Sequence, residues 1–144
     1  MFSTIRERGG LAYQVTATSI EGVDPGFVAM YAATSPGREH RVVEAMLDEM
    51  GRIRREPPSA GELRRVKRHL VGTRAIGQQR AAARAASLSL GQLYGLGHDV
   101  EERYPGQIDA VTPDAVRRAA RRYLDPGRMV VACVGPDAEQ LRLI

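Results

Sequence analysis

Two segments near the beginning of the chain alternate between apolar and polar residues, which is typical of β-strands with one buried face. The first is residues 11–20 (LAYQVTATSI), and the second, more apolar segment is residues 27–34 (FVAMYAAT). The stretch between them, EGVDPG, contains the proline–glycine pair of a turn. The pattern therefore predicts an antiparallel hairpin with a longer loop. The residues expected on the apolar face of the first strand are Leu11, Tyr13, Val15 and Ala17.

The middle of the chain shows apolar residues spaced by three and four positions, which indicates amphipathic helices. Ser59 and Glu62 have the spacing of a capping box, and Thr112 before a proline marks a second helix start. Gly72 and Gly77 predict a bend or break between residues 72 and 80. The helices expected from these signals cover residues 39–55, 59–72, 81–94 and 113–124.

The last apolar segment, RMVVACVG at residues 128–135, predicts a strand that is buried on both faces at the centre of a sheet. Before the final helix, Pro105 and Gly106 predict a turn. The expected order is therefore β-β-α-α-α-α-β. This is an α/β (α+β) class in which a mixed, largely antiparallel sheet packs against a layer of helices. Because no linker or internal repeat interrupts the pattern, residues 1–144 are expected to form a single domain.

The composition is that of a globular protein. Of 144 residues, 43% are hydrophobic and 26% are charged, with a mean hydropathy of −0.30, which excludes a disordered or collagen-like chain. No apolar run approaches the ~18 residues of a membrane-spanning helix. The single cysteine, Cys133, excludes an intramolecular disulfide and a cysteine-based zinc cluster.

The chain is basic, with a net charge of +4, which raises the possibility of a nucleic-acid-binding module. Of the 21 basic residues, however, only Lys67 is a lysine, and so strong an arginine bias weakens an argument from charge alone. Four arginines share one side of the helix expected at 113–124, and they are interpreted as a solvated face rather than a phosphate track. They are Arg117, Arg118, Arg121 and Arg122.

The titratable residues of the middle segment carry no recognisable catalytic or metal-binding pattern. His40 and Glu44 share a helix face and are interpreted as a solvated ion pair rather than a metal site. The sequence contains no phosphate-binding loop, dinucleotide fingerprint or nucleophile elbow. A small acidic cluster beside a turn is interpreted as surface; its members are Asp99, Glu101 and Glu102.

The segment IRERGGLAYQV at residues 5–15 resembles the helix–glycine–strand segment of the insulinase, pitrilysin and mitochondrial-processing-peptidase family of zinc peptidases. Three further segments resemble that family in the same order along the chain. They are SAGELRRVKRHLVG at 59–72, SLSLGQLYG at 87–95, and RYPGQIDAVTPDAVRRAARRYLDPGRMVVACVGP at 103–136.

These segments resemble the C-terminal, non-zinc half of the family, and the resemblance implies how the chain would work. In the family two halves close over a peptide chamber, and the inverted His-x-x-Glu-His zinc motif lies in the N-terminal half. This sequence has no such motif, so no metal ligand or cofactor is expected in this chain, and zinc is expected only in a partner half. The resemblance also implies that a strand and a long helix precede this segment, so the chain is expected to be truncated at its N-terminus.

The resemblance points to Arg6 and Tyr13 as the residues that this half contributes to substrate and oxyanion binding. The spacing is plausible, because Gly9 and Gly10 reverse the chain between a helix end and a strand, which lets the two side chains approach. A phenol O–H and a guanidinium are suitable donors to the charge that develops on a scissile carbonyl oxygen. Two structural interpretations stay open: Tyr13 as a core aromatic, and Arg6 as a cation favoured by a helix C-terminus.

The sequence thus predicts the C-terminal domain of a zinc-metalloendopeptidase-like protein that is not catalytic on its own. Its expected partners are a zinc-bearing half and a peptide substrate, with no membrane and a cytoplasmic location. A non-catalytic scaffolding relative and a nucleic-acid-binding module are the alternatives. Because an unpaired strand exposes backbone and apolar groups, the isolated chain is also expected to self-associate.

Overall fold

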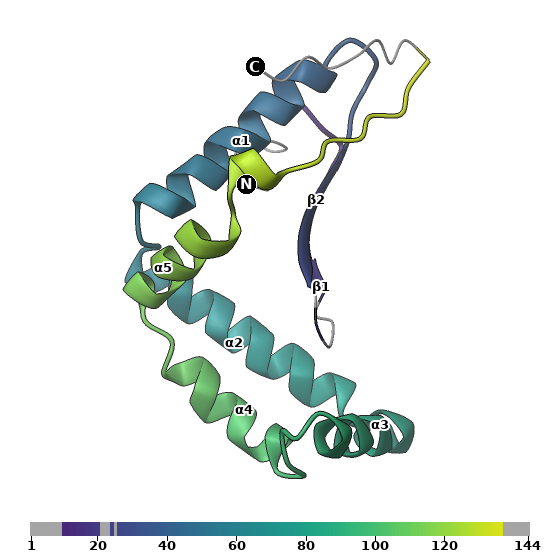
Figure 1. The fold of residues 1–144 in the computed structure, drawn as a ribbon, viewed down its shortest axis with the longest axis vertical. Helices are drawn as coiled ribbons and strands as arrows, with labels where there is room; N and C mark the ends of the chain where they lie inside the picture. The colour runs from purple at the N-terminus through teal and green to yellow at the C-terminus, as the bar shows by residue number, and fades with distance from the viewer. Residues whose placement is uncertain (1–9, 21–23, 25, 137–144) are drawn as a thin grey trace. The chain divides into compact units, whose positions relative to one another are not determined.

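A computed structural model describes residues 10–20, 24 and 26–136 of the chain (Figure 1). The described residues contain one antiparallel strand pair and five α-helices, which confirms the α+β class. They divide into two compact units, one formed by residues up to Glu56 together with those from Ala119 onward, the other by Pro57–Arg118. The single domain 1–144 expected from the sequence stays a prediction.

The first unit is built around the predicted hairpin. Strand β1 (Gln14–Ile20) pairs with β2 (Phe27–Ala33) in an antiparallel register that sets Val15 opposite Ala32 and Ile20 opposite Phe27. Because side chains alternate along a strand, Val15 and Ala32 share one face, and that face packs against Val42 of the following helix. A small core of buried side chains therefore joins the hairpin to a helix.

Helix α1 (Glu39–Arg55) has the bounds that the sequence predicted. Val42 and Met50 are buried, whereas His40 and Glu44 lie exposed on its other side. At the C-terminal end of α1, the Arg121 Nε–H donates a hydrogen bond of 2.8 Å to the carbonyl oxygen of Arg54. Helix C-terminal carbonyls lack intrahelical donors, so Arg121 satisfies one of them.

Arg121 belongs to α5 (Pro113–Tyr123), which begins where the sequence predicted, with the Ala115 N–H bonded to Thr112 Oγ1 at 3.2 Å. Its four arginines form an exposed or partly exposed face, as the sequence predicted. Three of them also have partners on that surface: Arg117 pairs with Asp114 at 3.0 Å, Arg121 bonds to α1, and the Arg122 guanidinium lies 5.3 Å from the centre of the Tyr123 ring.

The segment after α5 differs most from the prediction. A short 3₁₀ turn, η2 (Pro126–Arg128), leads into residues 129–136, which are not part of a sheet in the described part of the chain. The side chains of Val130 and Val134 are 92% and 100% exposed. The prediction of a central strand, and with it the order β-β-α-α-α-α-β, is therefore wrong here. A buried strand needs neighbours on both sides, and β2 is paired only with β1 within the described residues.

The second unit consists of α2 (Ala60–Gly77), α3 (Ala81–Leu93) and α4 (Val100–Asp109), with the start of α5. Ser59 Oγ accepts from the Glu62 N–H at 3.2 Å, as the capping box predicted. The predicted break falls at residues 78–80, after an uninterrupted α2. Helix α4 replaces the turn expected at Pro105 and is an element that the sequence pattern missed.

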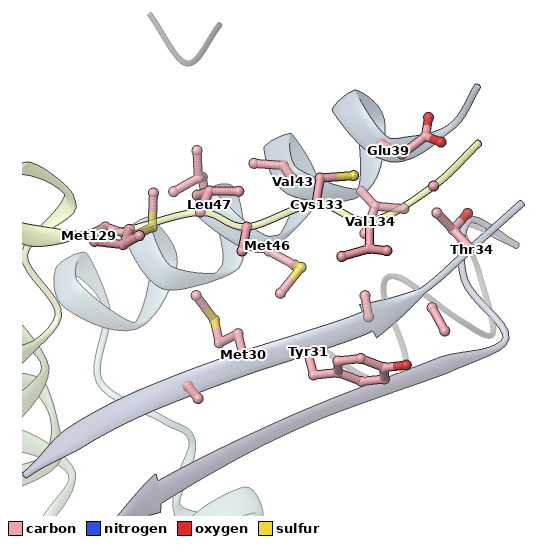
Figure 2. Close-up of a pocket in the computed structure, with 18 of the residues that line it drawn as sticks. Met30, Tyr31, Thr34, Glu39, Val43, Met46, Leu47, Met129, Cys133 and Val134 are labelled. Carbon is pink, nitrogen blue, oxygen red and sulfur yellow. The ribbon is translucent and has the colours of Figure 1, made fainter. Parts of the chain in front are cut away.

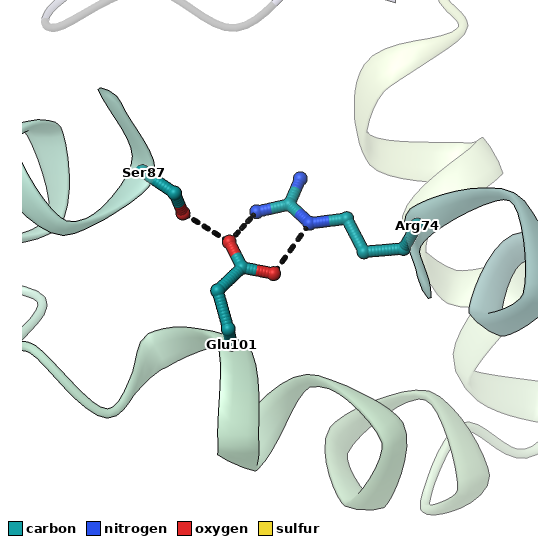
Figure 3. A network of polar contacts seen from close by, with 3 residues as sticks. All are labelled: Arg74, Ser87 and Glu101. Atoms are coloured by element: carbon teal, nitrogen blue, oxygen red, sulfur yellow. Dashed lines mark hydrogen bonds and ion pairs between the residues drawn. The ribbon is translucent and has the colours of Figure 1, made fainter. Parts of the chain in front are cut away.

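A polar cluster joins the three helices of this unit (Figure 3). The Glu101 carboxylate on α4 accepts hydrogen bonds of 2.9 and 2.5 Å from Arg74 on α2, and a further one from the Ser87 hydroxyl on α3. The interpretation of Glu101 as a surface residue is therefore wrong, because α4 turns its carboxylate toward its neighbours. Lys67 adds a second tie, donating to the carbonyl oxygen of Asp109 at 2.7 Å.

Among the described residues, no helix is both long enough and apolar enough to cross a lipid bilayer.

Candidate functional site

The backbone that precedes Tyr13 is held by side chains from the loop between β2 and α1. Gly10 adopts a φ of +55°, the left-handed conformation that favours glycine, and its carbonyl oxygen accepts from Arg38 Nη1 at 3.1 Å. The next carbonyl oxygen, that of Leu11, accepts from the Thr34 hydroxyl at 2.5 Å. Two consecutive carbonyl groups are therefore anchored before the tyrosine.

A third hydrogen bond involves Tyr13 itself, whose N–H donates to the carbonyl oxygen of Ala33 at 3.0 Å. Ala12 is buried and packs into the core beside Val15, so two successive residues, Leu11 and Ala12, lie at least partly inside. Strand β1 begins only at Gln14. The strand predicted for residues 11–20 therefore begins later than expected, and of the β1 residues only Val15 is buried.

This local geometry leaves the Tyr13 side chain 67% exposed. The prediction that Tyr13 shares the buried face of Val15 is wrong, because Tyr13 precedes β1 and the side chain that packs beside Val15 is that of Ala12. The interpretation of Tyr13 as a core aromatic of this chain is wrong for the same reason. The structure thus presents a phenol on an anchored backbone. Arg6, its expected companion, lies outside the described residues, and no arrangement of the pair is established.

A groove of about 790 Å³ runs beside the hairpin within the first unit, and Tyr13 is among the residues that line it. Its walls are β2, α1 and residues 128–136, and Figure 2 shows Met30 and Met46 pointing into the space between β2 and the extended segment. The charged residues among those that line it are Glu39 and Arg128. The sequence analysis did not predict this groove. The feature that could have indicated it is the apolar run at residues 128–135, which forms one of its walls.

The described residues do not fit a zinc ion. His40 Nδ1 lies 3.3 Å from Glu44 Oε1, with both side chains well exposed, which confirms the predicted ion pair. Among the residues that the structure describes, no three histidine, cysteine, aspartate or glutamate side chains gather as metal ligands. Structural and catalytic zinc sites need at least three protein ligands. The side chains in the described part of the chain therefore offer no zinc site of their own.

Comparison with known proteins connects these features to one family. Residues 1–70 match the family model described as the Peptidase M16 inactive domain. An "uncharacterized zinc protease" of Streptomyces coelicolor is 29% identical over 146 residues, which cover 99% of this chain and 31% of that protein. A protein of the same description from Mycobacterium leprae is 30% identical and matches 99% of this chain and 32% of its own length. The chain thus spans about a third of these relatives.

Two solved structures share the fold. The inactive peptidase domain of a Bordetella parapertussis protein described as a zinc protease superposes with a TM-score of 0.70 and 21% identity, over 84% of this chain and 65% of that domain. A Bordetella pertussis protein of similar description gives a TM-score of 0.69 and 21% identity, over 84% of this chain and 67% of that protein. The chain is therefore similar in sequence to the inactive domain of the Peptidase M16 family and to proteins described as zinc proteases, and it shares the fold of two solved domains.

Proposed function

We propose that the chain acts as the non-catalytic half of a zinc peptidase, closing a peptide chamber together with a zinc-bearing half on another domain or polypeptide. Three findings support this role: the match to an inactive domain, the zinc-protease description of relatives three times as long, and the lack of a ligand set among the described residues. The partner half would supply the metal and its ligands. This chain would supply part of the chamber wall and hydrogen-bond donors to the substrate.

The observation that carries the proposal is the presentation of Tyr13. Three hydrogen bonds to the backbone of residues 10, 11 and 13 hold the chain at this point, while the phenol side chain projects outward. A donor fixed before substrate arrives needs little reorganisation, which is the condition for effective stabilisation of a developing oxyanion. Tyr13 would donate its O–H to the scissile carbonyl oxygen of a peptide held by the partner half, and Arg6 would hold substrate carbonyl groups.

The test is the Tyr13→Phe variant assayed with its zinc-bearing partner. Because the hydroxyl acts on charge that develops only in the transition state, kcat should fall by about 10²–10³ while KM changes little. Arg6→Ala should change both parameters, since a guanidinium also binds ground-state carbonyl groups. The matched control is Tyr94→Phe, an exposed tyrosine at the end of α3 that does not line the groove, which should leave kcat within about twofold. Full activity of Tyr13→Phe would remove Tyr13 from the site.

The alternatives make different predictions in the same assay. A scaffolding relative would bind the zinc-bearing half without raising its activity. A nucleic-acid-binding module would bind DNA or RNA with an affinity that falls steeply with salt. The structure weakens the second alternative, because three of the four arginines on α5 have intramolecular partners.

We also propose that the isolated chain self-associates and resides in the cytoplasm. Exposed apolar side chains such as Val130 and Val134 favour association when no partner covers them. Cys133 has no disulfide partner among the described residues, which is compatible with a reducing compartment. Cell fractionation checks the location.

A further inference from the structure

The backbone that leads into Tyr13 is held mainly by side chains and not by a β-ladder. Strand β1 begins at Gln14, so residues 10–12 lie outside the strand pair. The Leu11 carbonyl oxygen instead accepts a hydrogen bond of 2.5 Å from the Thr34 hydroxyl, which is 23 positions away along the chain. The position of the phenol therefore depends on a side chain at the other end of the hairpin.

Thr34 is well placed to hold this segment. It directly follows β2, which ends at Ala33, and it is partly buried. Its β-branched side chain has few χ1 rotamers, so the hydroxyl keeps a defined direction. The Ala33 carbonyl oxygen accepts from the Tyr13 N–H at 3.0 Å. Two successive residues at the end of β2 therefore bond to Leu11 and to Tyr13.

Ala12 lies between these two contacts and is itself fixed. Its side chain is 7% exposed and belongs to the small core that contains Val15 and Val42. The Leu11 carbonyl group before it and the Tyr13 N–H after it are both bonded. The motion left to the phenol is thus rotation about its own side-chain bonds. Loss of the Leu11 contact would release the first of these constraints.

Arg38 provides a second anchor on the same segment. Its carbonyl oxygen accepts from the Val42 N–H at 3.1 Å in the first turn of α1, while its Nη1 donates to the carbonyl oxygen of Gly10. This side-chain contact is exposed, whereas the contact of Thr34 is partly buried. Water can replace an exposed donor, but a partly buried carbonyl group that loses its donor stays unsatisfied. Thr34 is therefore the stronger anchor.

We propose that Thr34 and, more weakly, Arg38 are positioning residues, which hold the Tyr13 phenol where it donates to the scissile carbonyl oxygen. The inference rests on the proposed function of Tyr13. The Thr34 hydroxyl proton is already donated to Leu11, so Thr34 acts through the backbone and not on the substrate. Misplacement of a reacting group by about 1 Å can cost about 10²-fold in rate. Thr34 should therefore affect kcat and leave KM unchanged.

The first measurement needs no peptidase activity. Thr34→Val keeps the shape but removes the hydroxyl, Thr34→Ser keeps the hydroxyl, and Thr18→Val is the matched control at an exposed position of β1. Hydrogen exchange followed by mass spectrometry on the full chain should show residues 11–15 exchanging at least about fivefold faster in Thr34→Val. Exchange there should be unchanged in the other two variants. Unchanged exchange in α1 shows that the fold is kept.

The second measurement is the kinetic assay with the zinc-bearing partner. Thr34→Val should lower kcat by about tenfold at constant KM, less than the loss of the phenol hydroxyl itself, and Thr34→Ser should restore kcat to within about twofold. In the Tyr13→Phe background, Thr34→Val should change kcat by less than about twofold, because no hydroxyl remains to be positioned. A merely structural role of Thr34 would lower activity equally in both backgrounds.

The outcomes separate this inference from the proposed function. Reduced activity of Tyr13→Phe with full activity of Thr34→Val, or with equal effects of Thr34→Val in both backgrounds, would overturn the positioning role alone. Unchanged exchange in residues 11–15 of Thr34→Val would do the same. Full activity of Tyr13→Phe would overturn the proposed function and this inference with it. If Thr34→Val unfolds the chain, Arg38→Met decides, because it should lower kcat about threefold and only when the Tyr13 hydroxyl is present.

Discussion

The guanidinium of Arg74 on α2 and the carboxylate of Glu101 on α4 meet through two hydrogen bonds, from Nε at 2.9 Å and from Nη2 at 2.5 Å. Paired donors of this kind match a carboxylate in both charge and geometry. The same guanidinium lies 5.1 Å from the centre of the Tyr104 ring, one turn further along α4. With the Ser87 hydroxyl on the same carboxylate, the pair holds together three helices that share few buried apolar side chains.

The first prediction concerns the stability of this unit. Glu101→Gln removes the charge but keeps the shape, and it should lower the free energy of unfolding by about 1.5–3 kcal/mol, the usual contribution of hydrogen bonds to a charged group. The matched control is Glu102→Gln, at the neighbouring exposed position, which should change it by less than about 0.5 kcal/mol. Denaturant unfolding followed by helical circular dichroism measures both. Equal effects of the two substitutions would contradict the structural role of Glu101.

The second prediction is a pH dependence that depends on Glu101. Its hydrogen bond with Arg74 holds the pKa of the carboxyl below its usual range, with Ser87 acting in the same direction against the cost of burial. A carboxyl whose folded-state pKa is depressed contributes stability above its unfolded-state pKa and loses it as the pH falls through the folded-state value. The stability difference between the wild type and Glu101→Gln should therefore be constant near neutral pH and shrink below about pH 4.5. A stability difference that stays constant down to about pH 3, which is well below the usual pKa of a carboxyl group, would contradict this assignment.

The third prediction compares two glycines inside helices. A Cβ on Gly91 of α3 would lie 2.8 Å from the carbonyl oxygen of Gly97 and 3.2 Å from Val100 Cγ1, so Gly91→Ala should destabilise by about 1–3 kcal/mol. A Cβ on Gly72 of α2 would meet nothing within 4 Å, so Gly72→Ala should stabilise by about 0.5–1 kcal/mol. Thermal unfolding distinguishes the two by opposite shifts of Tm. A stabilising Gly91→Ala would show that the turn after α3 yields to the added methyl group.

The fourth prediction is the association state of the isolated chain. Sedimentation at micromolar concentrations should show concentration-dependent association and binding of an apolar dye, because Val130 and Val134 are exposed. A monodisperse monomer at high micromolar concentration, without dye binding, would show that the chain closes its own apolar surface.

The sequence pattern predicted elements well where the signals are local. Helix α1 has the predicted bounds because its apolar stripe and the two prolines after it act within a few residues. The caps at Ser59 and Thr112 follow from the same short-range chemistry. Helix α4 was missed because Pro105 and Gly106 are typical of turns. It persists because side chains from α2 hold it near both ends, at Glu101 and at the carbonyl oxygen of Asp109.

The features of the candidate site could not be predicted from local sequence patterns, because they depend on residues that are distant along the chain. Whether residues 129–134 form a strand depends on which neighbouring strands are present, and an apolar run in the sequence does not indicate this. The exposure of Tyr13 depends on the anchors that Thr34 and Arg38 provide more than twenty residues away. Periodicity alone placed that side chain on the wrong face. The family resemblance, in contrast, was readable from the segments themselves, and the comparisons confirm it.

If the chain acts as proposed, it takes part in peptide hydrolysis only together with a zinc-bearing partner. The most direct measurement is the zinc content and peptidase activity of the purified chain, of the companion His-x-x-Glu-His polypeptide, and of their mixture. We predict that the chain alone holds no stoichiometric zinc and cleaves no peptide, and that the mixture is at least about 10²-fold more active than the companion alone, the contribution of one oxyanion donor. One tightly held zinc per chain with activity in the chain alone, or a companion that is equally active without it, would contradict the account.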